Sequence, residues 1–211
     1  MTRTRQVPRA EAPASVLPVY KRLFGDRDPV VEPGTATGTP GNWWTVFAQT
    51  PPVLDHMVAG FGLFSSPDRV LPPSLRELAL TRTGFTSQSQ FVFSQHCKAA
   101  RAAGLSNEQI AAIPTWAVSE LFSGAERAVL AYTDEVVLAD GRVQDATFAA
   151  LAAVLDEVAI IELTYAIASY RLHATMCRAL RLEYDDVDER IVEIAAPTAG
   201  NDDVMGTISL R

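Results

Sequence analysis

The amino-acid sequence predicts an all-α protein, and three observations support this prediction. Apolar residues recur at steps of three and four along most of the 211-residue chain, which is the period of a helix with one buried face. Signals for helix starts also recur, with serine three residues ahead of glutamate or glutamine and proline at first helical positions. The alternating pattern of a β-strand does not occur in the sequence. We therefore expect a bundle of helices.

Length and composition favour one sizeable core with extensions, since 48% of the residues are apolar. The net charge is −7 and no basic stretch is interleaved with aromatic residues, so nucleic acid is not an expected partner. The apolar stretches are too short to span a bilayer, and the first residues, MTRTRQVPRAEAP, lack an apolar signal segment. We expect a cytoplasmic protein without membrane contact. Cys97 and Cys177 have neither CxxC nor metal-ligand spacing, so neither a disulfide framework nor a zinc site is expected.

The first third of the chain is predicted to contain extensions and short helices. In order, these are a mobile arm over 1–13, a short helix over 14–24, a loop rich in Gly, Pro and Thr over 25–41, and apolar helices from 43 and over 51–64. The region around Trp43 and the loop are candidates for subunit contacts. His56 lies off the apolar face of its helix, so we expect it to be solvated.

The stretch from 71 to 105 contains two helical patterns in tandem and holds the candidate site. Ser74 and Glu77 have the spacing of a capping box at the start of the first helix, which is expected to stop at Gly84. Thr86 or Ser87 is expected to cap the second helix. On that helix, steps of three and four residues define an apolar stripe that directs His96 toward the core. The stripe comprises Ser89, Val92, Phe93, His96, Ala100 and Ala103.

Glu77 and His96 each allow a structural and a functional interpretation. A glutamate in a capping box needs no catalytic role, and a histidine on an apolar stripe is commonly a buried, hydrogen-bonded residue. A buried ring nitrogen does need a partner, because leaving it unpaired costs about 1–3 kcal/mol. The short connection makes the two helices antiparallel neighbours. Glu77 is therefore the candidate partner of His96.

The rest of the chain is predicted to form helices over 107–113, 123–141, 145–155 and 156–182. Their start signals are Ser106 with Gln109, Ser123 with Glu126, Asp145, and Asp156. The last helix is apolar on more than one side, which indicates a central position or an interface. On it, His173 is expected to pack or to support another side chain. Residues 183–203 carry eight acids and one arginine and are expected to form an acidic tail, a further candidate for subunit contacts.

The segments LRELAL, an aromatic-flanked QH, AGLSNEQIAAI, a tryptophan and GAERAVLAYTDEV resemble the carboxymuconolactone decarboxylase and alkylhydroperoxidase D-like family. The resemblance covers roughly 42–182, between an N-terminal extension over 1–41 and the tail over 183–211. It implies an alkylhydroperoxidase D-like helical bundle that assembles as a homo-oligomer, a trimer or hexamer. Peroxidase members of the family carry the pattern Glu-x11-Cys-x2-Cys-x3-His. In this chain Glu77 and His96 take the acid and histidine positions, with Ser89 and Val92 at those of the cysteines.

The resemblance also implies a chemistry. Thiol peroxidase activity is disfavoured, because Ser89 and Val92 cannot supply a thiolate and Cys97 should face away from the stripe. The preferred hypothesis is cofactor-free decarboxylation or proton-transfer isomerisation of a small carboxylic or lactone acid, with His96 as proton donor and Glu77 orienting it. No metal or organic cofactor is implied. The alternative is a non-catalytic ligand-binding or scaffolding oligomer, which Val92 favours. The candidate substrate contacts are Ser89, Gln95, Phe91, Phe93, Val92 and Trp43.

Overall fold

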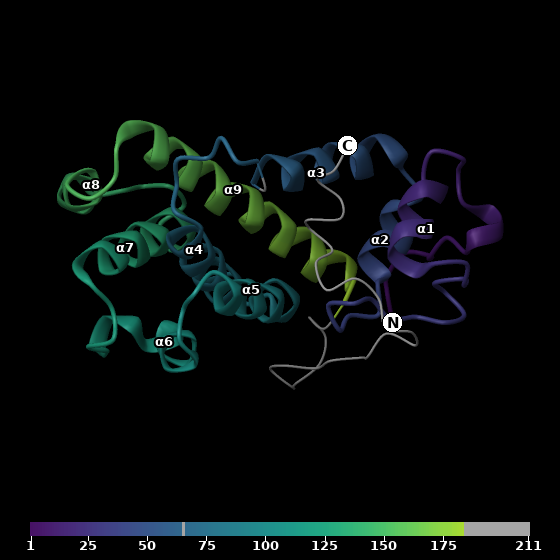
Figure 1. Cartoon of the computed structure of the whole chain (residues 1–211), viewed down its shortest axis with the longest axis horizontal. Helices are drawn as coiled ribbons and strands as arrows, with labels where there is room; N and C mark the ends of the chain where they lie inside the picture. The colour runs from purple at the N-terminus through teal and green to yellow at the C-terminus, as the bar shows by residue number, and fades with distance from the viewer. Residues whose placement is uncertain (65, 184–211) are drawn as a thin grey trace. The chain divides into compact units, whose positions relative to one another are not determined.

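A computed structural model describes residues 1–64 and 66–183 of the chain (Figure 1). This described part contains helices and no strands, so the predicted all-α class is confirmed. The acidic tail lies outside the described residues apart from Glu183. The elements are η1 (Arg9–Glu11), α1 (Leu17–Phe24), α2 (Asn42–Phe47), α3 (Pro51–Phe64), α4 (Pro73–Thr86), α5 (Gln90–Ala102), α6 (Asn107–Ala112), η2 (Ile113–Val118), α7 (Gly124–Leu138), α8 (Asp145–Ala152) and α9 (Glu157–Leu180).

The chain divides into two compact units. Unit 1 comprises Met1–Pro67 and the chain from Cys177 onward, and unit 2 comprises Asp68–Met176. The division falls inside α9, close to the end of that helix. The domain limits expected from the sequence, 1–41, 42–182 and 183–211, stay a prediction. Within the described residues, no helix is both long enough and apolar enough to cross a membrane.

The first residues of unit 1 are held in place rather than free. The backbone N–H of Val7 donates to the carbonyl of Thr45 at 2.9 Å, and the hydroxyl of Tyr20 donates to the carbonyl of Val7 at 2.8 Å. Val7 itself is buried, and the backbone N–H of Arg3 donates to the carbonyl of Leu180 at 2.9 Å. The expectation of a mobile arm over 1–13 is therefore wrong, because a buried apolar side chain and paired backbone groups anchor the segment.

An aromatic cluster forms the core around α2. The ring of Trp43 lies 4.7 Å from those of Trp44 and Phe47 and 5.5 Å from that of Phe61, centroid to centroid. Its backbone N–H, in the first turn of α2, donates to Oε1 of Glu183 at 2.8 Å. A carboxylate is favourable there because the first N–H groups of a helix have no partner within it. Trp43 is thus a core residue of unit 1, and the subunit contacts expected around it stay a prediction.

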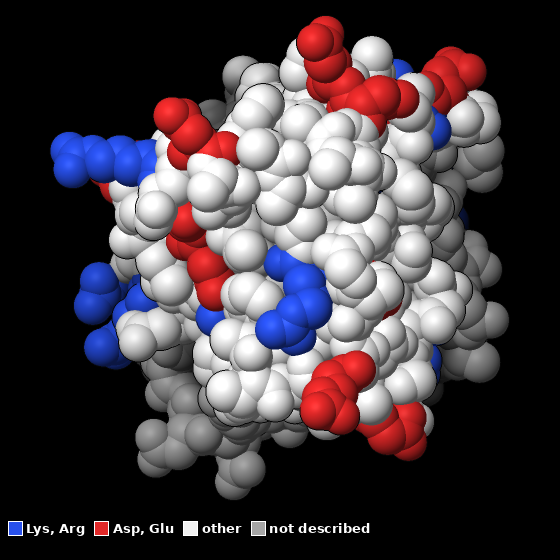
Figure 2. Space-filling view, turned by 90° about the vertical axis from the view of Figure 1, so that its left-hand side faces the viewer, with Lys and Arg blue, Asp and Glu red and all other residues white. Residues whose placement is uncertain are grey.

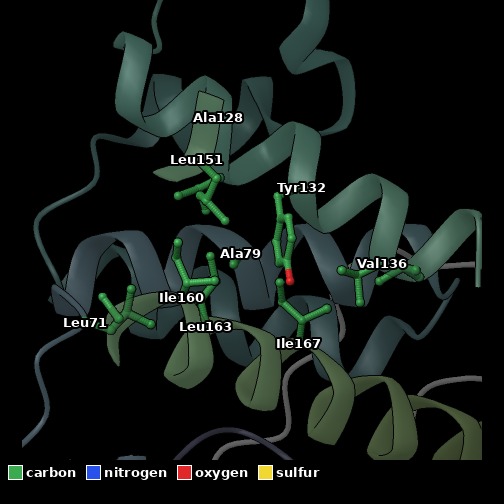
Figure 3. Packing of buried hydrophobic residues seen from close by; sticks show 12 residues of the cluster. Leu71, Ala79, Ala128, Tyr132, Val136, Leu151, Ile160, Leu163 and Ile167 are labelled. Atoms are coloured by element: carbon green, nitrogen blue, oxygen red, sulfur yellow. The ribbon is translucent and has the colours of Figure 1, made fainter. Parts of the chain in front are cut away.

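Two apolar clusters build unit 2, and α4 contributes to both. Ala79 of α4 belongs to the cluster drawn in Figure 3, which α7, α8 and α9 complete with residues such as Tyr132, Leu151 and Ile167. The neighbouring residue of α4, Leu78, belongs to the second cluster. The members of that cluster are Leu78, Cys97, Ala100, Leu105, Ile110, Ile113, Phe122 and Leu130. Because adjacent helical residues point about 100° apart, one helix can serve two cores.

The connection between α4 and α5 differs from the prediction. Helix α4 continues past Gly84 to Thr86, so the expected stop at Gly84 is wrong. A Cβ atom at Gly84 would lie 2.5 Å from the backbone nitrogen of Phe93, so glycine here permits a close approach of the two helices. Gln88 turns the chain with a φ of 55°, and the hydroxyl oxygen of Ser89, not Thr86 or Ser87, caps α5 by accepting from the N–H of Val92 at 3.3 Å.

The other predicted caps give a mixed result. The capping boxes at Ser106 and Ser123 are confirmed, each with its partner three residues later. The box at Ser74 is wrong: α4 begins at Pro73 with no side-chain cap. Glu77, the expected partner of Ser74, instead forms hydrogen bonds with the side chains of Arg76 and His96. Asp145 is the first residue of α8 rather than its cap, whereas the carboxylate of Asp156 accepts from the N–H of Ala159 at 2.8 Å ahead of α9.

A partly buried ion pair ties α4 to α7. Arg82 donates from Nε to Oδ1 of Asp134 at 2.6 Å and from Nη2 to Oδ2 at 2.9 Å. Its Nη1 donates to the carbonyls of Ile113 and Pro114, and the indole N–H of Trp116 also donates to Asp134 at 2.9 Å. Every charged atom of the pair is therefore hydrogen-bonded, which is the condition under which such a pair is tolerated away from water.

Figure 2, a view of the side where α7 and α8 lie in Figure 1, shows charged side chains of both signs scattered over a largely uncharged surface.

Candidate functional site

The candidate site lies in unit 2, where α4 presents Glu77 and α5 presents His96. Glu77 precedes Ser87 in the turn by ten residues and His96 follows it by nine, so the two side chains stand at the same level of an antiparallel helix pair. Oε2 of Glu77 lies 2.8 Å from Nδ1 of His96. Both residues are buried, with exposed fractions of 6% and 8%. The predicted contact between Glu77 and His96 is therefore present.

The charge state of Glu77 fixes which nitrogen of His96 is available. Burial raises the pKa of Glu77, but the hydrogen bond from His96 and the charges of His96 and Arg76 outweigh it and leave the pKa below its ordinary value. An ionised carboxylate can only accept, so Nδ1 of His96 must donate in this bond. In a neutral ring Nε2 then carries the lone pair, and in a protonated ring it carries the second N–H. Nε2 is thus the nitrogen that can exchange a proton with another molecule.

Arg76 is a member of this site that sequence reasoning missed. Its Nε donates to Oε1 of Glu77 at 2.9 Å, so the two oxygens of the carboxylate are shared between Arg76 and His96. This second bond fixes the orientation of the carboxylate and favours its ionised form. The only signal in the sequence is that an arginine precedes the glutamate. Adjacency on a helix does not by itself predict contact, since neighbouring side chains point in different directions.

Tyr170 and His173, on α9, complete the surroundings of His96. The ring of Tyr170 meets that of His96 edge to face, with centroids 4.3 Å apart and planes at 90°. His173 lies next to Tyr170 at 5.3 Å between centroids, so its predicted packing role is confirmed. Burial and the nearby charge of His96 lower the pKa of His173 to about 4. Burial and the charge of Glu77 raise the pKa of Tyr170. Both side chains are therefore neutral near pH 7.

Ser89 and Val92 stand where peroxidase members of the family have their two cysteines, and both residues have a structural role in α5. The side chain of Ser89 is buried and its oxygen caps α5. Val92, also buried, lies one turn before His96 on the same face of α5. Cys97 packs into the second apolar cluster, as expected for a residue facing away from the stripe, and burial raises the pKa of its thiol to about 11. Cys177 is buried as well.

The remaining predicted substrate contacts are spread over both units. Phe91, Phe93 and Gln95 are half-buried on α5. Phe93 packs against Phe85 of α4, at 5.9 Å between ring centroids. The amide nitrogen of Gln95 is buried and has no hydrogen-bond partner in the part of the chain that the structure describes. Trp43 belongs to unit 1. The roles of all these residues in binding a substrate stay predictions.

No group of three or more His, Cys, Asp or Glu side chains suited to a metal ion occurs among residues 1–64 and 66–183. His56 is exposed on α3, as its position off the apolar face predicted. The ionisable residues gathered around His96 are Arg76, Glu77, Tyr170 and His173.

Comparison with known proteins links the chain to one family. Residues 51–135 match the carboxymuconolactone decarboxylase family, a range that includes α4 and α5 and therefore Glu77 and His96. A comparison with curated proteins gives no match.

Solved structures share the fold. A protein of unknown function from Agrobacterium tumefaciens, described there as a suggested AhpD antioxidant defence protein, is 21% identical with a TM-score of 0.56, covering 70% of this chain and 96% of that chain. The apo form of the debrominase Bmp8 is 18% identical with a TM-score of 0.64, covering 96% of each chain. A cysteine-to-alanine variant of that debrominase, in complex with 2,3,4-tribromopyrrole, is 16% identical with a TM-score of 0.67, covering 86% of this chain and 92% of that chain.

These identities are low, so the likeness to solved structures establishes the fold alone. The chain therefore has the AhpD-like all-helical fold that the resemblance implied, and its residues 51–135 match the carboxymuconolactone decarboxylase family.

Proposed function

We propose that this protein is a carboxymuconolactone decarboxylase-like enzyme in which Glu77 and His96 act as an acid/base relay. Its reaction would be the cofactor-free decarboxylation, or the proton-transfer isomerisation, of a small carboxylic or lactone acid. The observation that carries the proposal is the 2.8 Å contact between Oε2 of Glu77 and Nδ1 of His96, both buried. A buried histidine oriented by an ionised carboxylate has the composition of a general acid or base.

In the decarboxylation, the bond between the carboxylate carbon and its neighbouring carbon breaks and carbon dioxide leaves. The electron pair passes into an adjacent carbonyl group to give an enolate. The Nε2–H of protonated His96 then donates its proton to the carbon atom, and the ring recovers a proton from water. Glu77 stabilises the imidazolium and holds its orientation through Nδ1. An isomerisation needs the same groups, with Nε2 removing a proton from one carbon and returning it to another.

Gln95 is the best-supported contact for a substrate oxygen in this proposal. A buried amide N–H without a partner costs about 1–3 kcal/mol, and a bound carbonyl or carboxylate oxygen would remove that cost. The half-buried rings of Phe91 and Phe93 on the same helix would supply apolar contacts. Thiol peroxidase chemistry has less support, because a thiol with a pKa of about 11, that of Cys97, is a poor source of thiolate near pH 7.

The test is a panel of cyclic β-keto acids and lactone acids, followed by release of carbon dioxide and by proton exchange in NMR. Glu77→Gln and His96→Ala are each expected to lower kcat by about 10²–10⁴-fold on the acid that is turned over. Cys97→Ala is the matched control, because Cys97 is the neighbour of His96 in sequence but packs in the apolar cluster. Turnover that survives both relay variants would show that the relay is wrong.

Two further outcomes separate the alternatives. If no acid is turned over but calorimetry detects binding that Gln95→Leu weakens, the protein is a ligand-binding module that uses the same residues. For the peroxidase alternative, the assay is peroxide consumption by a Cys97→Ala, Cys177→Ala double variant. Consumption that persists without either cysteine cannot be thiol chemistry, whereas its complete loss would favour the peroxidase over the relay.

A further inference from the structure

Helix α9 exposes an apolar face to solvent. Val158, Ile161, Tyr165 and Leu172 have exposed fractions of 53%, 68%, 45% and 53%. Ala168 and Thr175 are exposed on the same face. We call these six residues the α9 stripe. It extends over roughly 26 Å of helix at 1.5 Å per residue, and the exposed face of a surface helix is ordinarily polar.

The spacing of the α9 stripe indicates what kind of partner fits it. Its members follow one another at alternating steps of three and four residues, from Val158 to Thr175. This is the a and d pattern of a heptad, with a repeat of 3.5 residues. Side chains at this spacing interlock with those of another helix. The stripe is therefore suited to a helical partner of the same period.

We propose that the α9 stripe packs against the α9 stripe of a second copy of this chain, with the two helices antiparallel. A two-fold axis between 166 and 167 makes the stripe complementary to itself. Tyr165, the largest member, then lies opposite the partner's Ala168, the smallest, and Ile161 lies opposite the partner's Leu172. A parallel arrangement would place the two bulky Tyr165 rings against each other.

The charges beside the stripe favour the same arrangement. Glu157 flanks its first residue and Arg178 follows its last residue on the same side of α9, since both occupy the heptad position before an a residue. In the antiparallel pair, Glu157 of each copy approaches Arg178 of the other. In a parallel pair, Glu157 would instead face acidic residues at the same end of the partner helix, Glu162 among them. Opposite charges thus select the antiparallel pair.

This interface goes beyond the proposed function, and its test measures mass rather than turnover. Tyr170 and His173 lie on α9 but are buried, outside the stripe. Of the two assemblies implied by the family resemblance, a hexamer contains two-fold axes and a trimer does not. The proposal therefore requires an even number of subunits.

Sedimentation velocity of the full chain over a range of concentrations tests the interface. The wild type is expected to be a dimer or a larger even oligomer, and Ile161→Glu is expected to halve its mass, because it buries a charge opposite the apolar side chain of the partner's Leu172. Val118→Glu is the matched control: Val118 has an exposed fraction of 87% on η2, outside the stripe. Circular dichroism checks that each variant retains its helical content. A monomeric wild type, a trimer, or a mass unchanged by Ile161→Glu overturns the proposal.

Charge reversal tests the antiparallel order separately. Glu157→Arg and Arg178→Glu should each raise the Kd of self-association about tenfold, since each creates like-charge contacts at both ends of the pair. The double variant, which reverses both charges, should restore the wild-type Kd. Failure of the double variant to restore association, or no effect of either single variant, would overturn the antiparallel arrangement.

Discussion

Two buried histidines of unit 2 show how the surroundings of a residue set its role. His96 has a carboxylate at hydrogen-bond distance, and that carboxylate is oriented in turn by Arg76. His173 packs against the ring of Tyr170, and burial lowers its pKa to about 4. The first arrangement pairs the ring with a charged acceptor, whereas burial in the second disfavours the charged form of His173. The same side chain is thus suited to proton transfer at one position and to neutral packing at the other.

The lowered pKa of His173 predicts a loss of stability in acid. An unfolded chain binds a proton at this residue below about pH 6.5, but the folded chain does so only below about pH 4. Between these values the unfolded state holds more protons, so the free energy of unfolding falls as the pH is lowered, by about 3 kcal/mol in total. His173→Phe should remove this part of the pH dependence, measured by urea unfolding at pH 7 and pH 4.5. His56→Asn, at an exposed histidine, is the control. If the free energy of unfolding of His173→Phe falls between pH 7 and pH 4.5 by as much as that of the wild type, the prediction is contradicted.

At the scale of elements, the helix pair α4 and α5 depends on one close approach. Gly84 lies inside α4, where the backbone of Phe93 leaves no room for a side chain. This approach and the turn through Gln88 and Ser89 set the register that places Glu77 opposite His96. The register of the candidate site is therefore a property of the helix pair, and not of Glu77 and His96 alone.

Gly84→Ala is expected to lower the free energy of unfolding by about 1–3 kcal/mol, because the new Cβ would meet the nitrogen of Phe93 at 2.5 Å and the helices must move apart. Gly60→Ala in α3 is the matched control, since a Cβ there meets nothing within 4 Å. Alanine at that position should stabilise the protein by about 0.5–1 kcal/mol through its helix propensity. Urea unfolding at pH 7 gives both values, and equal effects of the two substitutions would contradict the proposed steric cause.

Across the whole molecule, each unit contains a carboxylate that joins distant segments of the chain. In unit 2, Asp134 accepts from Arg82 and Trp116 and joins α7 to α4 and η2. In unit 1, Glu183 accepts from the first turn of α2, bringing the chain after α9 to the aromatic cluster. Both contacts join segments far apart in sequence, so each closes a long loop of chain within its unit.

Amide hydrogen exchange can measure the stability of each unit by itself. Asp134→Ala leaves the charge of Arg82 without its partner and should destabilise unit 2 by about 3 kcal/mol, with faster exchange in α4 and α7. Glu183→Gln should instead speed exchange in α2, because a charged acceptor at the start of the helix becomes neutral. Faster exchange spread evenly over 1–64 and 66–183 in either variant would show that the two units open together.

Much of the fold could be predicted because it depends on local chemistry. The helix class and the capping boxes at Ser106 and Ser123 follow from side chains that bond the backbone three residues away. The same local reasoning failed at Ser74, where Glu77 forms stronger bonds with Arg76 and His96 than a cap would offer. A local sequence pattern shows which hydrogen bonds a side chain can form. Which of them it does form depends on the other partners that the folded chain brings close to it.

By itself, the sequence determined that the chain is helical and that an acid and a histidine lie 19 residues apart across a short turn. Helical period and a short connection are properties of neighbouring residues, so these two facts suffice to make Glu77 the candidate partner of His96. Only the tertiary structure decided that Arg76 takes the second carboxylate oxygen, that Tyr170 covers the imidazole ring and that the stripe of α9 stays exposed. Those features depend on which helix faces meet, and packing of distant segments, rather than local bonding, selects them.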